Sequence, residues 1–67
     1  MITNLEFYDG NGFKCFSCTY HSCGKPFMLF GNNESGNFRI GNYKDVDIIT
    51  KISIENQINT EYENIYK

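Results

Sequence analysis

All three cysteines and the only histidine of this 67-residue chain lie within one nine-residue window, residues 15–23. The spacing is Cys-x2-Cys-x2-His-x-Cys, and thiolate and imidazole groups are the ligands that zinc takes in structural sites. Two residues between cysteines allow a tight turn to aim both sulfur atoms at one ion. The window therefore predicts a candidate zinc site, with the ligands Cys15, Cys18, His21 and Cys23.

The same window is also typical of a β-strand, and the two interpretations conflict. Residues 13–20 alternate so that Phe16, Cys18 and Tyr20 share one face, while Phe13, Cys15 and Ser17 share the other. On a regular strand, Cys15 and Cys18 point to opposite faces and cannot share a metal ion. The favoured interpretation treats the cysteines as small apolar side chains and expects no cofactor. One bound zinc ion is the alternative.

Thiol catalysis is the other chemistry that the window could support. A catalytic cysteine needs a lowered pKa, commonly from a histidine partner or a helix N-terminus. His21 is close in sequence to Cys18, but no third group that would orient its imidazole is evident. A chain of 67 residues also leaves little room for a substrate pocket. We therefore predict that the chain is not an enzyme and has no catalytic residues.

Length and composition predict one small domain, residues 1–67, with a modest core. A chain of this size buries only about 60% of its unfolded surface. Aromatic residues make up 16% of the chain, which supplies enough apolar bulk for a core without a metal. No apolar run approaches the roughly 18 residues of a membrane span, and no signal peptide is apparent. We expect a cytoplasmic protein of a host cell.

The strand and turn pattern predicts an α+β fold. Strands are expected over residues 2–8, 13–20 and 27–30 and from residue 37, with glycine- and asparagine-rich turns between them. Residues 46–54 have β-branched side chains at period two and predict a fifth strand. Residues 55–66 have the spacing of an amphipathic helix. The prediction is a small antiparallel sheet of four to five strands with a short C-terminal amphipathic helix packed on it. The alternative is a helix that starts at Asp45, with the fifth strand absent.

Charge argues against direct nucleic-acid binding. The formal net charge is −2, no basic patch appears, and nucleic-acid affinity comes mainly from lysine and arginine on phosphates. Residues 55–66 contain three glutamates and no base, which suits a basic surface on a partner protein. A sheet this small cannot bury all eleven aromatic rings, so an exposed aromatic docking surface is expected. The expected partner-binding residues are Tyr8, Phe16, Tyr20, Glu55, Glu61, Tyr62, Glu63 and Tyr66.

These features together predict a small non-enzymatic module that binds a host protein. The abundance of Asn, Ile, Lys, Tyr and Phe indicates an AT-rich genome. The specific hypothesis is a phage or mobile-element inhibitor of the anti-defence type, such as an anti-CRISPR, that docks on a host nucleic-acid-handling protein. The alternative is a zinc-stabilised binding domain that uses the Cys15, Cys18, His21 and Cys23 cluster. An exposed edge strand could also pair two copies into a homodimer.

Overall fold

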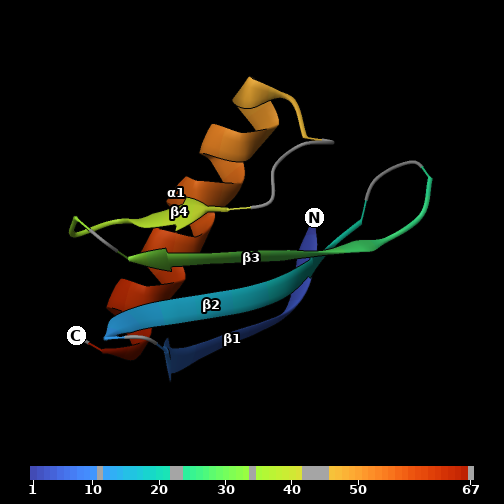
Figure 1. Cartoon of the computed structure of the whole chain (residues 1–67). Helices are drawn as coiled ribbons and strands as arrows, with labels where there is room; N and C mark the ends of the chain where they lie inside the picture. The colour runs from blue at the N-terminus through green and yellow to red at the C-terminus, as the bar shows by residue number, and fades with distance from the viewer. Residues whose placement is uncertain (11, 22–23, 34, 42–45, 67) are drawn as a thin grey trace.

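The computed structural model describes residues 1–10, 12–21, 24–33, 35–41 and 46–66 (Figure 1). These residues form an α+β fold, which confirms the predicted class. Four antiparallel strands make one open sheet, and a C-terminal helix follows them. Among the described residues, no helix combines the length and the apolar composition that a bilayer crossing requires.

The sheet has the same order as the chain, and each strand pairs with the next: β1 (Ile2–Gly10), β2 (Phe13–Tyr20), β3 (Phe27–Asn33) and β4 (Phe38–Ile40). The helix α1 (Ile48–Ile65) crosses one face of the sheet and contacts both edge strands, β4 and β1 (Figure 1). Within the described ranges, no other element covers the opposite face.

A β-bulge in β1 puts three apolar side chains on the helix-facing side. The β1–β2 register shifts between Thr3 and Glu6, and Asn4 has a φ of 55°. Asparagine accepts this left-handed conformation more readily than most residues. The extra residue reverses the alternation, so Ile2 packs against the core together with Leu5 and Phe7. A regular strand would place Ile2 on the opposite face from Leu5.

The core lies between the sheet and α1, and all the elements except β1 contribute fully buried side chains to it. Gly31 makes the central contact possible, because a Cβ atom there would clash with the Arg39 carbonyl oxygen and the Phe16 ring. The buried apolar residues are Phe16, Cys18, Leu29, Phe38, Ile40, Ile54 and Ile58.

The predicted fifth strand over residues 46–54 is wrong, because α1 begins at Ile48. The predicted C-terminal helix is present but starts seven residues before the expected residue 55. The Asp47 side chain caps α1 by accepting a hydrogen bond from the Thr50 backbone N–H. The alternative of a longer helix is therefore the better description, although its proposed first residue, Asp45, lies outside the described residues.

Candidate functional site

The predicted zinc ligands do not converge where the structure describes them. Strand β2 continues without a break to Tyr20, so Cys15 and Cys18 lie on opposite faces of the sheet. Cys15 is paired with Tyr8 and Asn32 in the neighbouring strands, whereas Cys18 is opposite Leu29 and is 1% exposed. A single ion held by both sulfur atoms does not fit this strand.

Of the other two predicted ligands, His21 lies within the described residues and is bonded elsewhere. The imidazole Nε2 of His21 is hydrogen-bonded to the Thr3 hydroxyl at 2.8 Å, and Cys23 lies outside the described residues. Burial raises the pKa of the Cys18 thiol, which disfavours the thiolate that binds metals and attacks substrates. In the described part of the chain, no three His, Cys, Asp or Glu side chains are placed to hold a metal ion.

The aromatic residues predicted to bind a partner from the first hairpin lie on different sides of the sheet. Phe16 is completely buried in the core and cannot contact a partner in this fold. Tyr20 is half-buried on the helix side, where its ring meets Phe27 edge-on at 5.4 Å. Tyr8 is 46% exposed on the opposite face. These three rings therefore do not form one surface.

The helix residues predicted to bind a partner are also separated. Glu61 and Glu63 are exposed, but two residues along a helix are about 160° apart around its axis. Tyr62 is half-buried and packs on Phe38, with 4.9 Å between the two ring centroids. Tyr66 is exposed, and its ring centroid lies 4.7 Å from that of Tyr62. The three glutamates of residues 55–66 therefore do not form one continuous surface, and Glu55 is buried.

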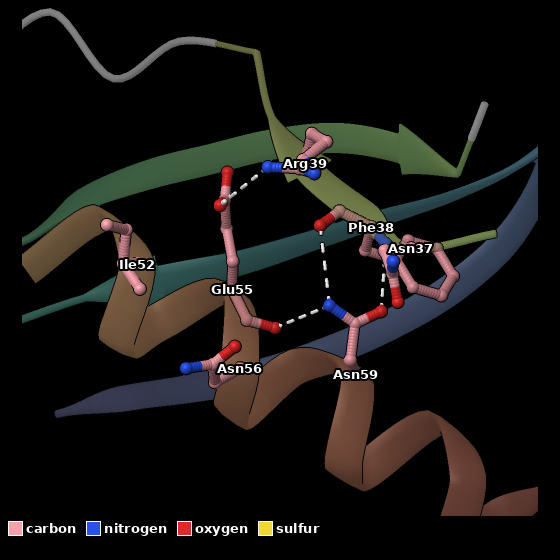
Figure 2. Close-up of a pocket in the computed structure, with 7 residues that line it drawn as sticks. All are labelled: Asn37, Phe38, Arg39, Ile52, Glu55, Asn56 and Asn59. Carbon is pink, nitrogen blue, oxygen red and sulfur yellow. Dashed lines mark hydrogen bonds and ion pairs between the residues drawn. The ribbon is translucent and has the colours of Figure 1, made fainter. Parts of the chain in front are cut away.

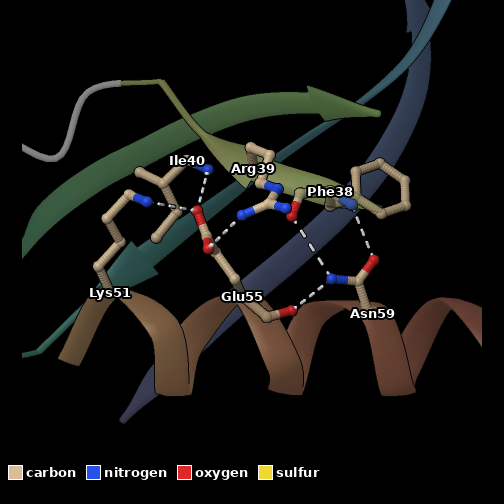
Figure 3. Close-up of polar contacts among 6 residues, drawn as sticks. All are labelled: Phe38, Arg39, Ile40, Lys51, Glu55 and Asn59. Atoms are coloured by element: carbon tan, nitrogen blue, oxygen red, sulfur yellow. Dashed lines mark hydrogen bonds and ion pairs between the residues drawn. The ribbon is translucent and has the colours of Figure 1, made fainter. Parts of the chain in front are cut away.

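Glu55 joins the helix to the edge of the sheet, a role that the sequence analysis missed (Figure 3). Its carboxylate accepts a hydrogen bond from the Ile40 backbone N–H at 2.9 Å. The Lys51 ammonium lies 3.3 Å from the same oxygen, and the Arg39 guanidinium lies 3.9 Å from the other. The signal in the sequence was a single carboxylate within the apolar stripe of α1. Such a residue requires a partner when it is buried.

A groove of about 370 Å³ lies between β4 and α1, and its walls are mostly polar (Figure 2). The Glu55 carboxylate and the Asn59 amide bind backbone groups of β4, and Asn59 Nδ2 also donates to the Glu55 backbone carbonyl. Among the described residues, no buried side-chain nitrogen or oxygen lacks a hydrogen-bond partner. The groove therefore has no unsatisfied buried group with which to select a ligand. It is lined by Asn37, Phe38, Arg39, Ile52, Glu55, Asn56 and Asn59.

Three aromatic side chains and one methionine are exposed on the face of the sheet opposite α1. We call this surface the open sheet face and define it by Tyr8, Phe13, Met28 and Phe30, which are 40% to 52% exposed. The register places Phe30 beside Ser17, and Met28 beside Thr19, so small polar side chains separate the large ones. Of these four residues, the sequence analysis predicted only Tyr8 to bind a partner. It placed Phe13 on the strand face opposite Phe16 without assigning it a role, and the apolar run of residues 27–30 gave no indication of which side chains face outward.

Charged residues are sparse on the open sheet face. Glu6 pairs with Ser17 on this side, and Arg39 pairs with Asn32 at the β4 edge.

Comparison of the chain with protein-family models, with curated proteins and with solved structures finds no match. The geometry of the open sheet face is therefore the observation that bears on function.

Proposed function

We propose that the chain is a non-enzymatic protein-binding module and that the open sheet face is its docking surface. The observation that carries this proposal is the exposure of Tyr8, Phe13, Met28 and Phe30 on the sheet face opposite α1. Tyrosine, phenylalanine and methionine are enriched at the centres of protein interfaces, where charged residues are depleted. The open sheet face has this composition.

The same rings could stack on nucleic-acid bases, but the surrounding charge favours a protein. Single-strand binding combines aromatic rings with a basic groove that follows the phosphates. Among the described strand residues, Arg39 is the basic side chain on the open sheet face. It lies at the β4 edge and approaches Glu55. The net charge of −2 further disfavours phosphate binding.

The partner that this surface suits has an apolar centre and a basic rim. Glu6 is exposed beside the aromatic residues, and the chain as a whole is acidic. Complementary charge would increase the association rate and select the orientation of docking. The narrower hypothesis, an inhibitor from a phage or mobile element that acts on a host nucleic-acid-handling protein, draws on size and composition and stays a prediction.

The proposal is tested by affinity capture from a lysate with three versions of the chain. They are the wild type, a Phe13→Ser/Phe30→Ser variant of the open sheet face, and an Ile49→Ser control. Ile49 is 76% exposed on α1, so the control also removes a large apolar side chain from the surface. We expect the wild type and the control to retain the same stoichiometric protein and the double variant to lose it.

Titration calorimetry with the purified partner then measures the effect. We expect the double variant to bind at least about tenfold more weakly, because central aromatic residues dominate interface energies. Circular dichroism checks that all three versions are folded. Equal binding by the wild type and the double variant would remove the open sheet face as the docking surface. The absence of any stoichiometric partner would count against a binding module.

A further inference from the structure

The two edges of the sheet differ in how their backbone groups are satisfied. At the β4 edge, side chains of α1 take the place of a neighbouring strand (Figure 3). The Phe38 N–H donates to Asn59 Oδ1 at 2.8 Å, and Asn59 Nδ2 donates to the Phe38 carbonyl at 3.4 Å. The Ile40 N–H donates to Glu55. This edge is closed to another strand, which is one way in which proteins prevent unwanted pairing.

In the part of the chain that the structure describes, the β1 edge carries no such cover. Within the described residues, β1 pairs with β2 on one side, and no strand or side chain is bonded along its other side. Hydrogen-bonding direction alternates along antiparallel strands. The backbone N–H groups of Phe38 and Ile40 point away from β3. Counting this alternation through the register to β1 leaves the backbone N–H and C=O groups of Phe7 and Asp9 pointing away from β2. The bulge at Asn4 limits the regular part of this edge to residues 6–10.

We propose that β1 pairs antiparallel with β1 of a second copy, about a two-fold axis that passes beside Tyr8. Phe7 then faces Asp9 of the second copy, and Asp9 faces Phe7 of the second copy. Each of these two pairs exchanges both of its backbone hydrogen bonds. The interface is isologous, as in most small homodimers. It continues the sheet from one chain into the next, with both helices on one side and both open sheet faces on the other.

Two neighbouring registers are excluded by physical features of β1. Moving the axis to Phe7 brings Leu5, at the bulge, opposite Asp9 and leaves only the central pair with regular geometry. Moving it to Asp9 places the two Asp9 carboxylates directly opposite each other, which is destabilising. With the axis at Tyr8, Glu6 faces Gly10 and no carboxylates are opposed. The two Tyr8 rings form a cross-strand aromatic pair, which is favourable.

The first test measures the mass of the chain in solution over a range of concentrations, by native mass spectrometry and light scattering. We expect a dimer in the wild type. Asp9→Pro removes the outward N–H and should weaken association by about tenfold or more, since two symmetric hydrogen bonds are lost. Asp9→Ala is the matched control, because it also loses the ion pair with Lys14 but keeps the N–H. Its dimer should persist.

A second variant tests the register and does not depend on proline being tolerated. In a Cys15→Ser background, Tyr8→Cys would place the Cβ atoms of the two copies about 4.5–5.5 Å apart, near disulfide range. A mild oxidant should then link the dimer covalently. Glu6→Cys in the same background should not link, because it lies opposite Gly10 and is about 13 Å from its own equivalent.

Three results would overturn the dimer. The first is a wild-type chain that is monomeric at every concentration, and the second is an Asp9→Pro variant that associates as strongly as Asp9→Ala. The third is cross-linking by Tyr8→Cys no greater than by the Cys15→Ser background or by Glu6→Cys. None of these results bears on the proposed partner of the open sheet face, which the capture experiment tests separately.

Discussion

At the level of single residues, the carboxylate of Glu55 connects α1 to β4. It is 5% exposed, yet it accepts a hydrogen bond from Ile40 and lies beside Lys51 and Arg39. A buried charge is tolerated only when opposite charge and hydrogen bonds replace its lost water. Glu55 has both the opposite charges and the hydrogen bond. Through this bond, a residue of α1 supplies the acceptor for an outward backbone N–H of β4.

We expect Glu55→Ala to lower the free energy of unfolding by about 1–3 kcal/mol, because the buried Ile40 N–H would lose its acceptor. Glu55→Gln keeps an acceptor and should cost less. Glu63→Ala is the matched control and should change stability by less than about 0.5 kcal/mol, since Glu63 is exposed. Urea denaturation measures all three. Equal stability of Glu55→Ala and Glu63→Ala would contradict the role assigned to Glu55.

At the level of elements, Asp47 decides where α1 begins. Its side chain accepts the Thr50 N–H at 3.3 Å and so satisfies a backbone donor that the helix itself leaves free. Hydrogen bonds from Thr50, first from its side chain and then from its backbone, lower the pKa of the Asp47 carboxyl below its usual value. The charged form of Asp47 is therefore the form that stabilises the helix.

The lowered pKa predicts an acid-dependent loss of stability. A carboxyl whose pKa is lower in the folded state stabilises the fold above its unfolded pKa, and this contribution is lost as pH falls through the folded pKa. The loss should therefore occur below about pH 4. Asp47→Asn can still cap the helix but does not titrate. We expect the stability advantage of the wild type over Asp47→Asn to shrink as the pH falls from 6 to 2.

Thermal melts followed by circular dichroism at each pH measure this difference between the two proteins. Other acidic groups titrate equally in both and cancel in the comparison. A difference that does not change with pH would show that the Asp47 charge makes no contribution to the start of α1.

At the level of the whole molecule, Phe38 joins the sheet and the helix into one core. Its ring centroid lies 5.2 Å from that of Phe7, 5.8 Å from that of Phe16 and 4.9 Å from that of Tyr62. These rings come from β1, β2 and α1 respectively. Aromatic pairs at such distances are stabilising beyond the area that they bury.

We expect Phe38→Ala to cost about 3–5 kcal/mol, the usual range for truncating a buried phenylalanine. This loss is close to the whole stability of a small domain, so a large unfolded population is expected. Phe30→Ala is the matched control, because Phe30 is 45% exposed and lies outside this core. Urea denaturation and one-dimensional NMR measure the outcome. A Phe38→Ala chain as stable as Phe30→Ala would contradict the central position of Phe38.

Local patterns in the sequence were sufficient to predict the first hairpin and the fold class. The alternation of β1 and β2 predicted the faces of Leu5 and Phe7 and of Cys15 and Cys18, because side chains alternate on any regular strand. The conflict between strand and zinc site was also visible in the spacing. The C-terminal helix followed from the apolar residues at helical spacing after Ile54.

The tertiary structure decided the features that depend on contacts between distant residues. Ile48, Thr50, Ile52 and Ile54 fit a strand as well as a helix. The helix prevails because Asp47 caps it and because its side chains Glu55 and Asn59 satisfy the edge of β4. Burial of Glu55, and exposure of Met28 and Phe30, likewise depend on which face of the sheet the helix covers. No local pattern reports that choice, since it is made by packing between segments far apart in the chain.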